Sequence, residues 1–178
     1  MSNLIFATEY NSSSKTLLQS TLEWVKREMN LKGYENPIKS VKLSQSYFSC
    51  KNRENELHFY VDDIKTTDLT DSVANIASKK LDSLFKYADS IGIELYVLIA
   101  ADKYEVYQNY IVDNPYPPKT LLTNFMDLYN HPHLINSKDT LSRLVEKGVP
   151  DVYWANNTHW GIIGSKAVAE HVLQHIEQ

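Results

Sequence analysis

The stretch from Thr70 to Ala100 restricts the possible folds more than any other part of this chain. It begins with an amphipathic helix that ends at Gly92 and has charged residues opposite an apolar face of Val73, Ala74, Ala77, Leu81, Leu84, Phe85 and Ala88. The following run, IELYVLIA, is apolar without clean alternation, which is typical of a parallel strand covered on both faces. A helix, a glycine and a buried strand make half of a βαβ unit. We therefore expect an α/β domain of three layers with a mainly parallel sheet.

Before this unit the sequence predicts one helix and two short strands. Polar residues 12–14 precede TLLQSTLEWVKREM, whose apolar face consists of Leu17, Leu18, Leu22, Val25 and Met29. A turn-rich stretch at residues 32–37 leads into VKLSQSYF at 41–48 and LHFYV at 57–61. We interpret these two runs as strands.

After the unit the sequence predicts three helices and a short strand. The proline-rich run NPYPP at 114–118 cannot continue a helix, so we expect an exposed extended loop there, the only candidate hinge. Helices are expected over residues 119–129 and 138–146, and Gly148 and Pro150 end the second. DVYW at 151–154 reads as a short strand, and a last helix has an apolar face of Val168, Val172 and Ile176.

Length and composition indicate one compact unit. The chain has 178 residues, of which 43% are hydrophobic and 22% charged, and these proportions suit an ordinary globular domain. We expect an α/β domain over residues 57–178, preceded by a helix and short strands in residues 1–56 that we assign to no known type.

Charge and hydropathy exclude two classes of partner. The net charge of −4 and the lack of Lys and Arg clusters argue against nucleic acid. No apolar run is long enough to span a membrane, and LIFA near the start is too short for a signal-peptide core. If the chain is complete as given we expect it in the cytoplasm, and otherwise a leader has been trimmed. Cys50 has no second cysteine for a disulfide or a metal pair.

Two loops are the candidates for function, because sites in open α/β sheets gather beyond the carboxyl ends of strands. The first begins Ala101-Asp102-Lys103-Tyr104, after the strand that starts at Ile93. The second spans residues 156–164 and contains His159.

The second loop resembles a known signature. Its Asn-Thr-His-Trp, followed by a glycine and a helix, is similar to the Asp-Thr-His-Trp motif of the SGNH hydrolase-like domain in the alginate O-acetyltransferase family. The family's Pro-x-Lys-x-x-Val-Tyr-like segment is matched by Lys103, Val106 and Tyr107. The order of elements also matches, and the resemblance covers about residues 57–176, with ELHFYVDD a faint match at its start.

The resemblance implies a flavodoxin-like, SGNH hydrolase-like fold, incomplete or reduced in these 178 residues. It also implies Ser-His-Asp acyl transfer on polysaccharide hydroxyls outside the cytoplasm, in the periplasm, without a cofactor. His159 corresponds to the family's histidine, the general base, and Trp160 to the tryptophan that follows it. A polysaccharide or other carbohydrate is the expected partner.

Two departures from the family pattern weaken this expectation. The aspartate falls on Asn157, and Asn156, where other SGNH hydrolases place it, is also an amide. An amide can orient an imidazole but cannot stabilise its charged form. The family's serine lies in a Gly-Asp-Ser turn downstream of the motif, and Gln178 comes before any such turn. The chain is then either the first part of a longer protein or a remnant that has lost the reaction.

The alternative is a catalytically inactive carbohydrate-binding or interaction module of the same fold. In either case Lys103, Tyr104, Tyr107 and Trp160 are candidates to contact a sugar, because tyrosines stack on sugar faces and lysine bonds hydroxyls. The competing interpretation is that these side chains pack the start of a helix. Trp154 carries the same ambiguity.

The remaining candidates favour ordinary structure. Ser165 follows Gly164 and is expected to cap the last helix. His171 and His175, four residues apart, could share a metal, as could His131 and His133, but no third ligand is evident. We expect no metal site.

Overall fold

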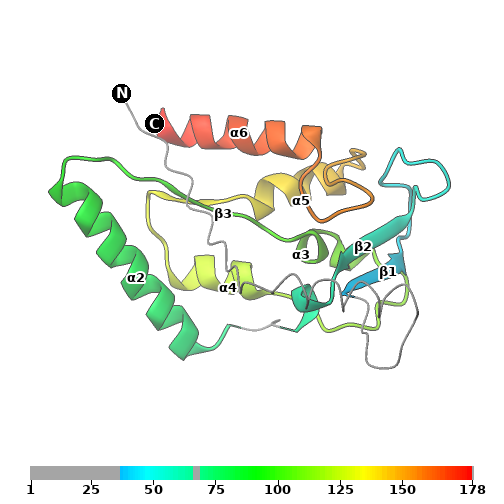
Figure 1. The fold of residues 1–178 in the computed structure, drawn as a ribbon, viewed down its shortest axis with the longest axis horizontal. Helices are drawn as coiled ribbons and strands as arrows, with labels where there is room; N and C mark the ends of the chain where they lie inside the picture. The colour runs from blue at the N-terminus through cyan, green and yellow to red at the C-terminus, as the bar shows by residue number, and fades with distance from the viewer. Residues whose placement is uncertain (1–36, 66–68, 178) are drawn as a thin grey trace, which may run out of the picture.

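The structure, a computed structural model, describes residues 37–65 and 69–177 (Figure 1). Its strands are β1 (Ile38–Lys42), β2 (Glu56–Tyr60), β3 (Val97–Ile99) and β4 (Leu134–Asn136). Its α-helices are α2 (Asp71–Ser90), α3 (Lys103–Tyr107), α4 (Leu121–Leu128), α5 (Lys138–Glu146) and α6 (Ile162–Ile176), and its 3-10 helices are η1 (Val61–Ile64) and η2 (Gln108–Tyr110). The helix expected over residues 16–29 lies outside the described residues.

The strands form two separate two-stranded sheets. β1 and β2 are antiparallel, with Ile38 opposite Tyr60. β3 and β4 are parallel, with Val97 opposite Leu134, and the chain between them passes through α3 and α4. In Figure 1, α5 and α6 lie on one side of β3 and α4 on the other. The expected mixture of helices and strands with parallel pairing is confirmed.

The helix predicted from Thr70 to Gly92 is α2. Thr70 caps it, since its hydroxyl accepts a hydrogen bond from the backbone N–H of Val73 at 3.4 Å. Gly92 adopts φ +71°, a conformation that favours glycine. The buried face is narrower than expected: Ala74, Phe85 and Ala88 are buried, whereas Val73 and Leu84 are about half exposed. Within the described ranges no helix is long and apolar enough to cross a membrane.

The buried strand predicted over residues 93–100 is shorter and more exposed than expected. Only residues 97–99 pair as β3, and all three are partly exposed. The first residue of the predicted strand completes the helix end instead, since the N–H of Ile93 donates to the carbonyl of Ala88 at 2.9 Å.

The strand predicted over residues 41–48 also has different limits. β1 ends at Lys42, because the chain turns there and sends Tyr47 and Phe48 into the core. The N–H groups of both residues donate to the carbonyl of Glu54, at 2.7 and 2.9 Å. The strand predicted over residues 57–61 is confirmed as β2, which begins and ends one residue earlier.

The strand predicted over residues 151–154 is wrong. Tyr153 forms only an isolated antiparallel bridge with Trp160, so the chain folds back on itself there. The N–H of Trp154 donates to the carbonyl of His159 at 3.0 Å, and the N–H of Gly161 donates to that of Val152 at 2.8 Å. His159 therefore lies in a closed loop and not beyond the end of a sheet strand.

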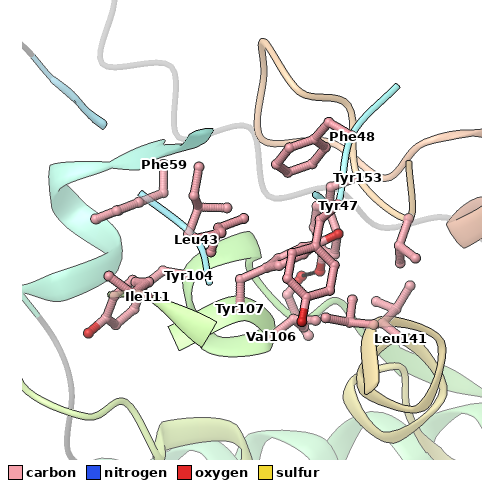
Figure 2. Close-up of a cluster of buried hydrophobic side chains, with 14 of the residues drawn as sticks. Leu43, Tyr47, Phe48, Phe59, Tyr104, Val106, Tyr107, Ile111, Leu141 and Tyr153 are labelled. Carbon is pink, nitrogen blue, oxygen red and sulfur yellow. Dashed lines mark hydrogen bonds between the residues drawn. The ribbon is translucent and has the colours of Figure 1, made fainter. Parts of the chain in front are cut away.

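Aromatic side chains form the centre of the core (Figure 2). The ring of Tyr107, from α3, lies 5.4 Å from that of Tyr47 and 5.9 Å from that of Tyr153, in edge-to-face arrangements. Phe59 of β2 packs on Tyr104 with ring centroids 4.9 Å apart. This cluster joins β2, α3 and the segment before the His159 loop into one packed body.

The start of α6 lies directly against the backbone of residues 151–152. A Cβ at Gly161 would overlap the carbonyl oxygen of Asp151, and one at Gly164 would overlap that of Val152. The helix begins at Ile162 with Gly161 as its N-cap, so the prediction that Ser165 caps it is wrong. Ser165 lies within the first turn, and its N–H donates to the carbonyl of Gly161 at 2.9 Å.

We expect Gly164→Ala to destabilise the protein by about 1–3 kcal/mol, because the backbone oxygen of Val152 cannot move aside as a flexible side chain would. This cost outweighs the gain in helix propensity, about 1 kcal/mol. Urea unfolding monitored by circular dichroism measures the difference. Ser165→Ala, an exposed position one residue on, is the matched control and should stay within about 0.5 kcal/mol of wild type. A Gly164→Ala variant as stable as wild type would contradict the close contact of α6 with residue 152.

Candidate functional site

The His159 loop, residues 154–160, brings an amide and an imidazole together. The side-chain oxygen Oδ1 of Asn157 accepts a hydrogen bond from the backbone N–H of His159 at 2.6 Å. The same oxygen lies 3.1 Å from ring nitrogen Nδ1 of His159. Both residues are exposed. Asn156, the other amide that sequence reasoning considered, has no hydrogen bond to His159 within the described part of the chain.

These two contacts fix the state of the neutral imidazole ring. The atom of Asn157 that accepts from a backbone N–H must be the oxygen, because the amide nitrogen only donates. An oxygen can only accept, so Nδ1 of His159 must carry the hydrogen. Nε2 then has a free lone pair, and it has no hydrogen-bond partner among residues 37–65 and 69–177. The ring is held in the tautomer that a general base needs.

Lys103 binds the backbone of the His159 loop from the interior of the protein. Its side chain is fully buried, and its ammonium Nζ donates to the carbonyls of Trp154, Ala155 and Asn157 at 2.8, 3.2 and 3.2 Å. Nζ also lies 4.6 Å from the centre of the Phe48 ring, a cation–π distance. Burial lowers the pKa of Lys103 to about 7, because the charged form loses its water. Asn157 is thus bonded through its backbone to Lys103 and through its side chain to His159.

Lys103 is itself placed by the start of α3. The carboxylate of Asp102 caps this helix by accepting from the N–H of Glu105 at 2.8 Å. Asp102 also pairs with Lys119 at 2.6 Å, and Glu105 pairs with Lys138 at 2.9 Å. Sequence reasoning missed these ion pairs. Asp-x-x-Glu at 102–105 is a capping-box pattern that could have indicated the helix start, whereas nothing in the sequence indicates the lysine partners.

The two tryptophans of the loop differ in exposure. Trp160 is half-buried, and its Nε1 donates to the hydroxyl of Tyr153 at 3.2 Å. That hydroxyl donates in turn to the carbonyl of Ala101 at 2.8 Å, and burial raises the pKa of Tyr153 so that it stays neutral. Trp160 therefore anchors the loop to the segment before α3. Trp154 is 42% exposed, so its ring can contact a ligand.

Lys103, Tyr104 and Tyr107, predicted as possible sugar contacts, have no exposed side-chain surface. The hydroxyl of Tyr104 donates to the carbonyl of Pro117 at 2.8 Å and so pins the proline-rich loop. Direct contact with a sugar is not open to these three side chains in this structure. Their arrangement agrees with the packing interpretation.

The paired histidines have other contacts. The His131 ring stacks on Phe85 with centroids 3.9 Å apart, and Nε2 of His175 lies 2.5 Å from the carbonyl of Pro132. His171 and His175 have ring centroids 6.3 Å apart. In the part of the chain that the structure describes, no group of three or more His, Cys, Asp or Glu side chains could hold a metal ion.

The pair of Asn157 and His159 can therefore accept a proton, but among the described residues no nucleophile is bonded to it. Among the described residues no serine hydroxyl bonds to His159. The hydroxyl of Ser49 donates to the carboxylate of Asp151 at 2.5 Å. Asn157 orients the ring but leaves a charged imidazolium less stabilised than a carboxylate would.

We expect the neutral ring of His159 to carry its hydrogen on Nδ1, because Oδ1 of Asn157 accepts from that nitrogen. Long-range proton–nitrogen spectra of the histidine ring distinguish the two tautomers. In Asn157→Ala the ring should exchange between both forms, whereas Asn156→Ala should leave the spectrum unchanged. A wild-type ring with its hydrogen on Nε2 would show that the Asn157 contact does not form in solution.

Known proteins give no further guide to this loop. No family model, no curated protein and no solved structure matches this chain. A function for it must follow from the residues and contacts described above.

Proposed function

We propose that the His159 loop is the general-base half of an acyl-transfer site that acts on esters of carbohydrate hydroxyls. The observation that carries this proposal is the 3.1 Å contact between Oδ1 of Asn157 and Nδ1 of His159. It leaves Nε2 free on an exposed loop in the tautomer that accepts a proton. The likeness of the loop to the Asp-Thr-His-Trp motif supports the same chemistry.

In the proposed reaction Nε2 of His159 removes the proton from a hydroxyl as its oxygen attacks the acyl carbonyl carbon. The proton then passes from Nε2 to the leaving alcohol oxygen as the ester bond breaks. In the family that this loop resembles, the attacking hydroxyl belongs to a serine, and water or an acceptor hydroxyl then removes the acyl group from that serine by the same proton transfers. No serine hydroxyl in the described part of the chain bonds to His159. Asn157 holds the ring throughout but supplies no negative charge, and the comparable replacement in serine proteases lowers turnover about 10⁴-fold. We therefore expect slow turnover.

The likeness of the loop to the Asp-Thr-His-Trp motif also leads us to propose a fold and a cellular location for the protein. Residues 57–178 would form an SGNH hydrolase-like domain in which helices cover both faces of a mainly parallel sheet, with β3 and β4 as part of that sheet. The protein would work outside the cytoplasm on a polysaccharide.

A second candidate is a binding module without catalysis. The exposed ring of Trp154 favours it, together with the exposed amides of Asn156 and Asn157. An exposed aromatic face beside amide groups suits a sugar ring, which offers C–H groups on its face and hydroxyls at its edge. Such a module would bind the carbohydrate whether or not position 157 carries a charge.

We expect Asn157→Asp to increase acetyl-ester hydrolysis, by up to about 10⁴-fold, because a carboxylate at this position stabilises the imidazolium that forms in the reaction. Release of nitrophenol from nitrophenyl acetate and of acetate from an acetylated oligosaccharide measure the rate. His159→Ala should abolish activity in both backgrounds.

Asn156→Asp is the matched control, since it adds the same charge one residue away without a contact to the ring, and it should leave the rate near that of wild type. Equal rates for Asn157→Asp and Asn156→Asp would contradict the catalytic proposal. Carbohydrate binding without hydrolysis by any variant would favour the binding module.

A further inference from the structure

The carbonyl groups of the His159 loop converge on one buried cation. Those of Trp154, Ala155 and Asn157 point at Nζ of Lys103, at 2.8, 3.2 and 3.2 Å. An ammonium has three N–H donors and no acceptor, so three carbonyls match it fully. The backbone from residue 154 to residue 157 thus curves around the lysine ammonium, while Trp154, Asn156 and Asn157 are exposed and Ala155 packs against the core.

We propose that Lys103 is a positioning residue for His159 and that only its ammonium form holds the His159 loop in its working geometry, so that alkali turns the site off. The inference rests on the proposed function of His159 and Asn157. The connection is short: Nζ of Lys103 binds the carbonyl of Asn157, and the side chain of Asn157 binds both the backbone and the ring of His159.

The neutral amine cannot replace the ammonium at this place. It has two N–H donors and a lone pair, so one of the three carbonyls would face a lone pair instead of a hydrogen. The Phe48 ring, 4.6 Å from Nζ, also favours the charged form. Burial acts in the opposite direction and brings the pKa of Lys103 to about 7, within reach of physiological change.

The other charged and titratable groups around α3 have partners or pKa shifts that distinguish them from Lys103. On α3 and its N-cap, Glu105 pairs with Lys138 and Asp102 with Lys119, while burial raises the pKa of Tyr107. From the segment before the loop come Asp151, which binds Ser49, and Tyr153, whose pKa burial also raises. Burial and the charge of Asp102 raise the pKa of Asp63 in η1 to about 6. The loop itself contributes His159, which the His159→Ala background of the second test below removes.

A positioning role and a purely structural role predict opposite pH dependences. The pKa of Lys103 in the folded chain lies below the ordinary value of 10.5, so the unfolded chain binds more protons between about pH 7 and 10.5. This lysine therefore makes the folded state more stable as pH rises through that window. If Lys103 positions His159, the rate of ester hydrolysis should instead fall over the same window, by about tenfold per pH unit above the midpoint of the Lys103 titration.

The first test is the pH dependence of ester hydrolysis by the full chain. In wild type, kcat should fall between about pH 7 and 9 while urea unfolding shows no loss of stability over that range, which lies below the ordinary pKa of the buried Tyr107 and Tyr153. Lys103→Met, which keeps the length of the side chain without its charge, should lower kcat at all pH values and remove the alkaline fall. Lys147→Met, an exposed lysine at the end of α5, is the control and should keep the wild-type profile. An alkaline fall that persists in Lys103→Met would overturn the inference.

The second test needs neither activity nor a substitution at Lys103. In His159→Ala with carbon-13-labelled lysine, the Lys103 side chain reports its own titration, and the backbone amides of residues 154–157 should shift with the same midpoint. Loop amides that ignore the lysine titration would overturn the inference whatever the activity. Loop amides that follow it, while no variant hydrolyses any ester, would leave the control of the loop by Lys103 standing and contradict the proposed function.

Discussion

A lysine ammonium that has lost its contact with water must find an acceptor inside the protein for each of its hydrogens. Lys103 finds them in the carbonyls of residues 154, 155 and 157, and these bonds decide the path of the loop that carries His159. Leaving such a charge unpaired would cost several kcal/mol. Two sets of hydrogen bonds therefore determine the conformation of the loop. The Lys103 ammonium binds its carbonyls on the buried side, and on the exposed side the amide oxygen of Asn157 accepts from the backbone N–H of His159.

The aromatic core packs around this arrangement. Phe48 covers Nζ of Lys103, and the Tyr107 ring beside it packs edge-on against Tyr47 and Tyr153. The hydroxyl of Tyr153 ties the Trp160 indole to the carbonyl of Ala101, just before α3. Both ends of the loop are thus fixed to the segment that supplies the lysine, while the middle of the loop stays at the surface.

Elements that depend on local sequence were predictable, and contacts between distant residues were not. The limits of α2 and α5 follow from helical periodicity and from end signals such as Gly92 and Thr70. The strand before α3 was predicted too long, because periodicity does not show that Ile93 completes the helix end.

In the candidate site, the motif indicated His159 and Asn157, but only coordinates distinguish Asn157 from Asn156 as the partner of the ring. The sequence suggested that Lys103 contacts a sugar at the surface, whereas it is buried. Its carbonyl partners lie more than fifty residues along the chain, and no local sequence pattern predicts the conformation of the loop that contains them.

The proposed function requires that a carbohydrate ester bind at the outer face of the His159 loop. Titration of the labelled full chain with an acetylated oligosaccharide, followed through backbone amide and tryptophan indole signals, tests it most directly. The account predicts that the largest shifts fall on Trp154, Asn157 and His159. Shifts confined to another place, or no shifts at all, would contradict it. One such place is the hollow on β1, β2 and the connection between them, lined by Ser40, Val41, Lys42, Asn52, Asn55 and Glu56.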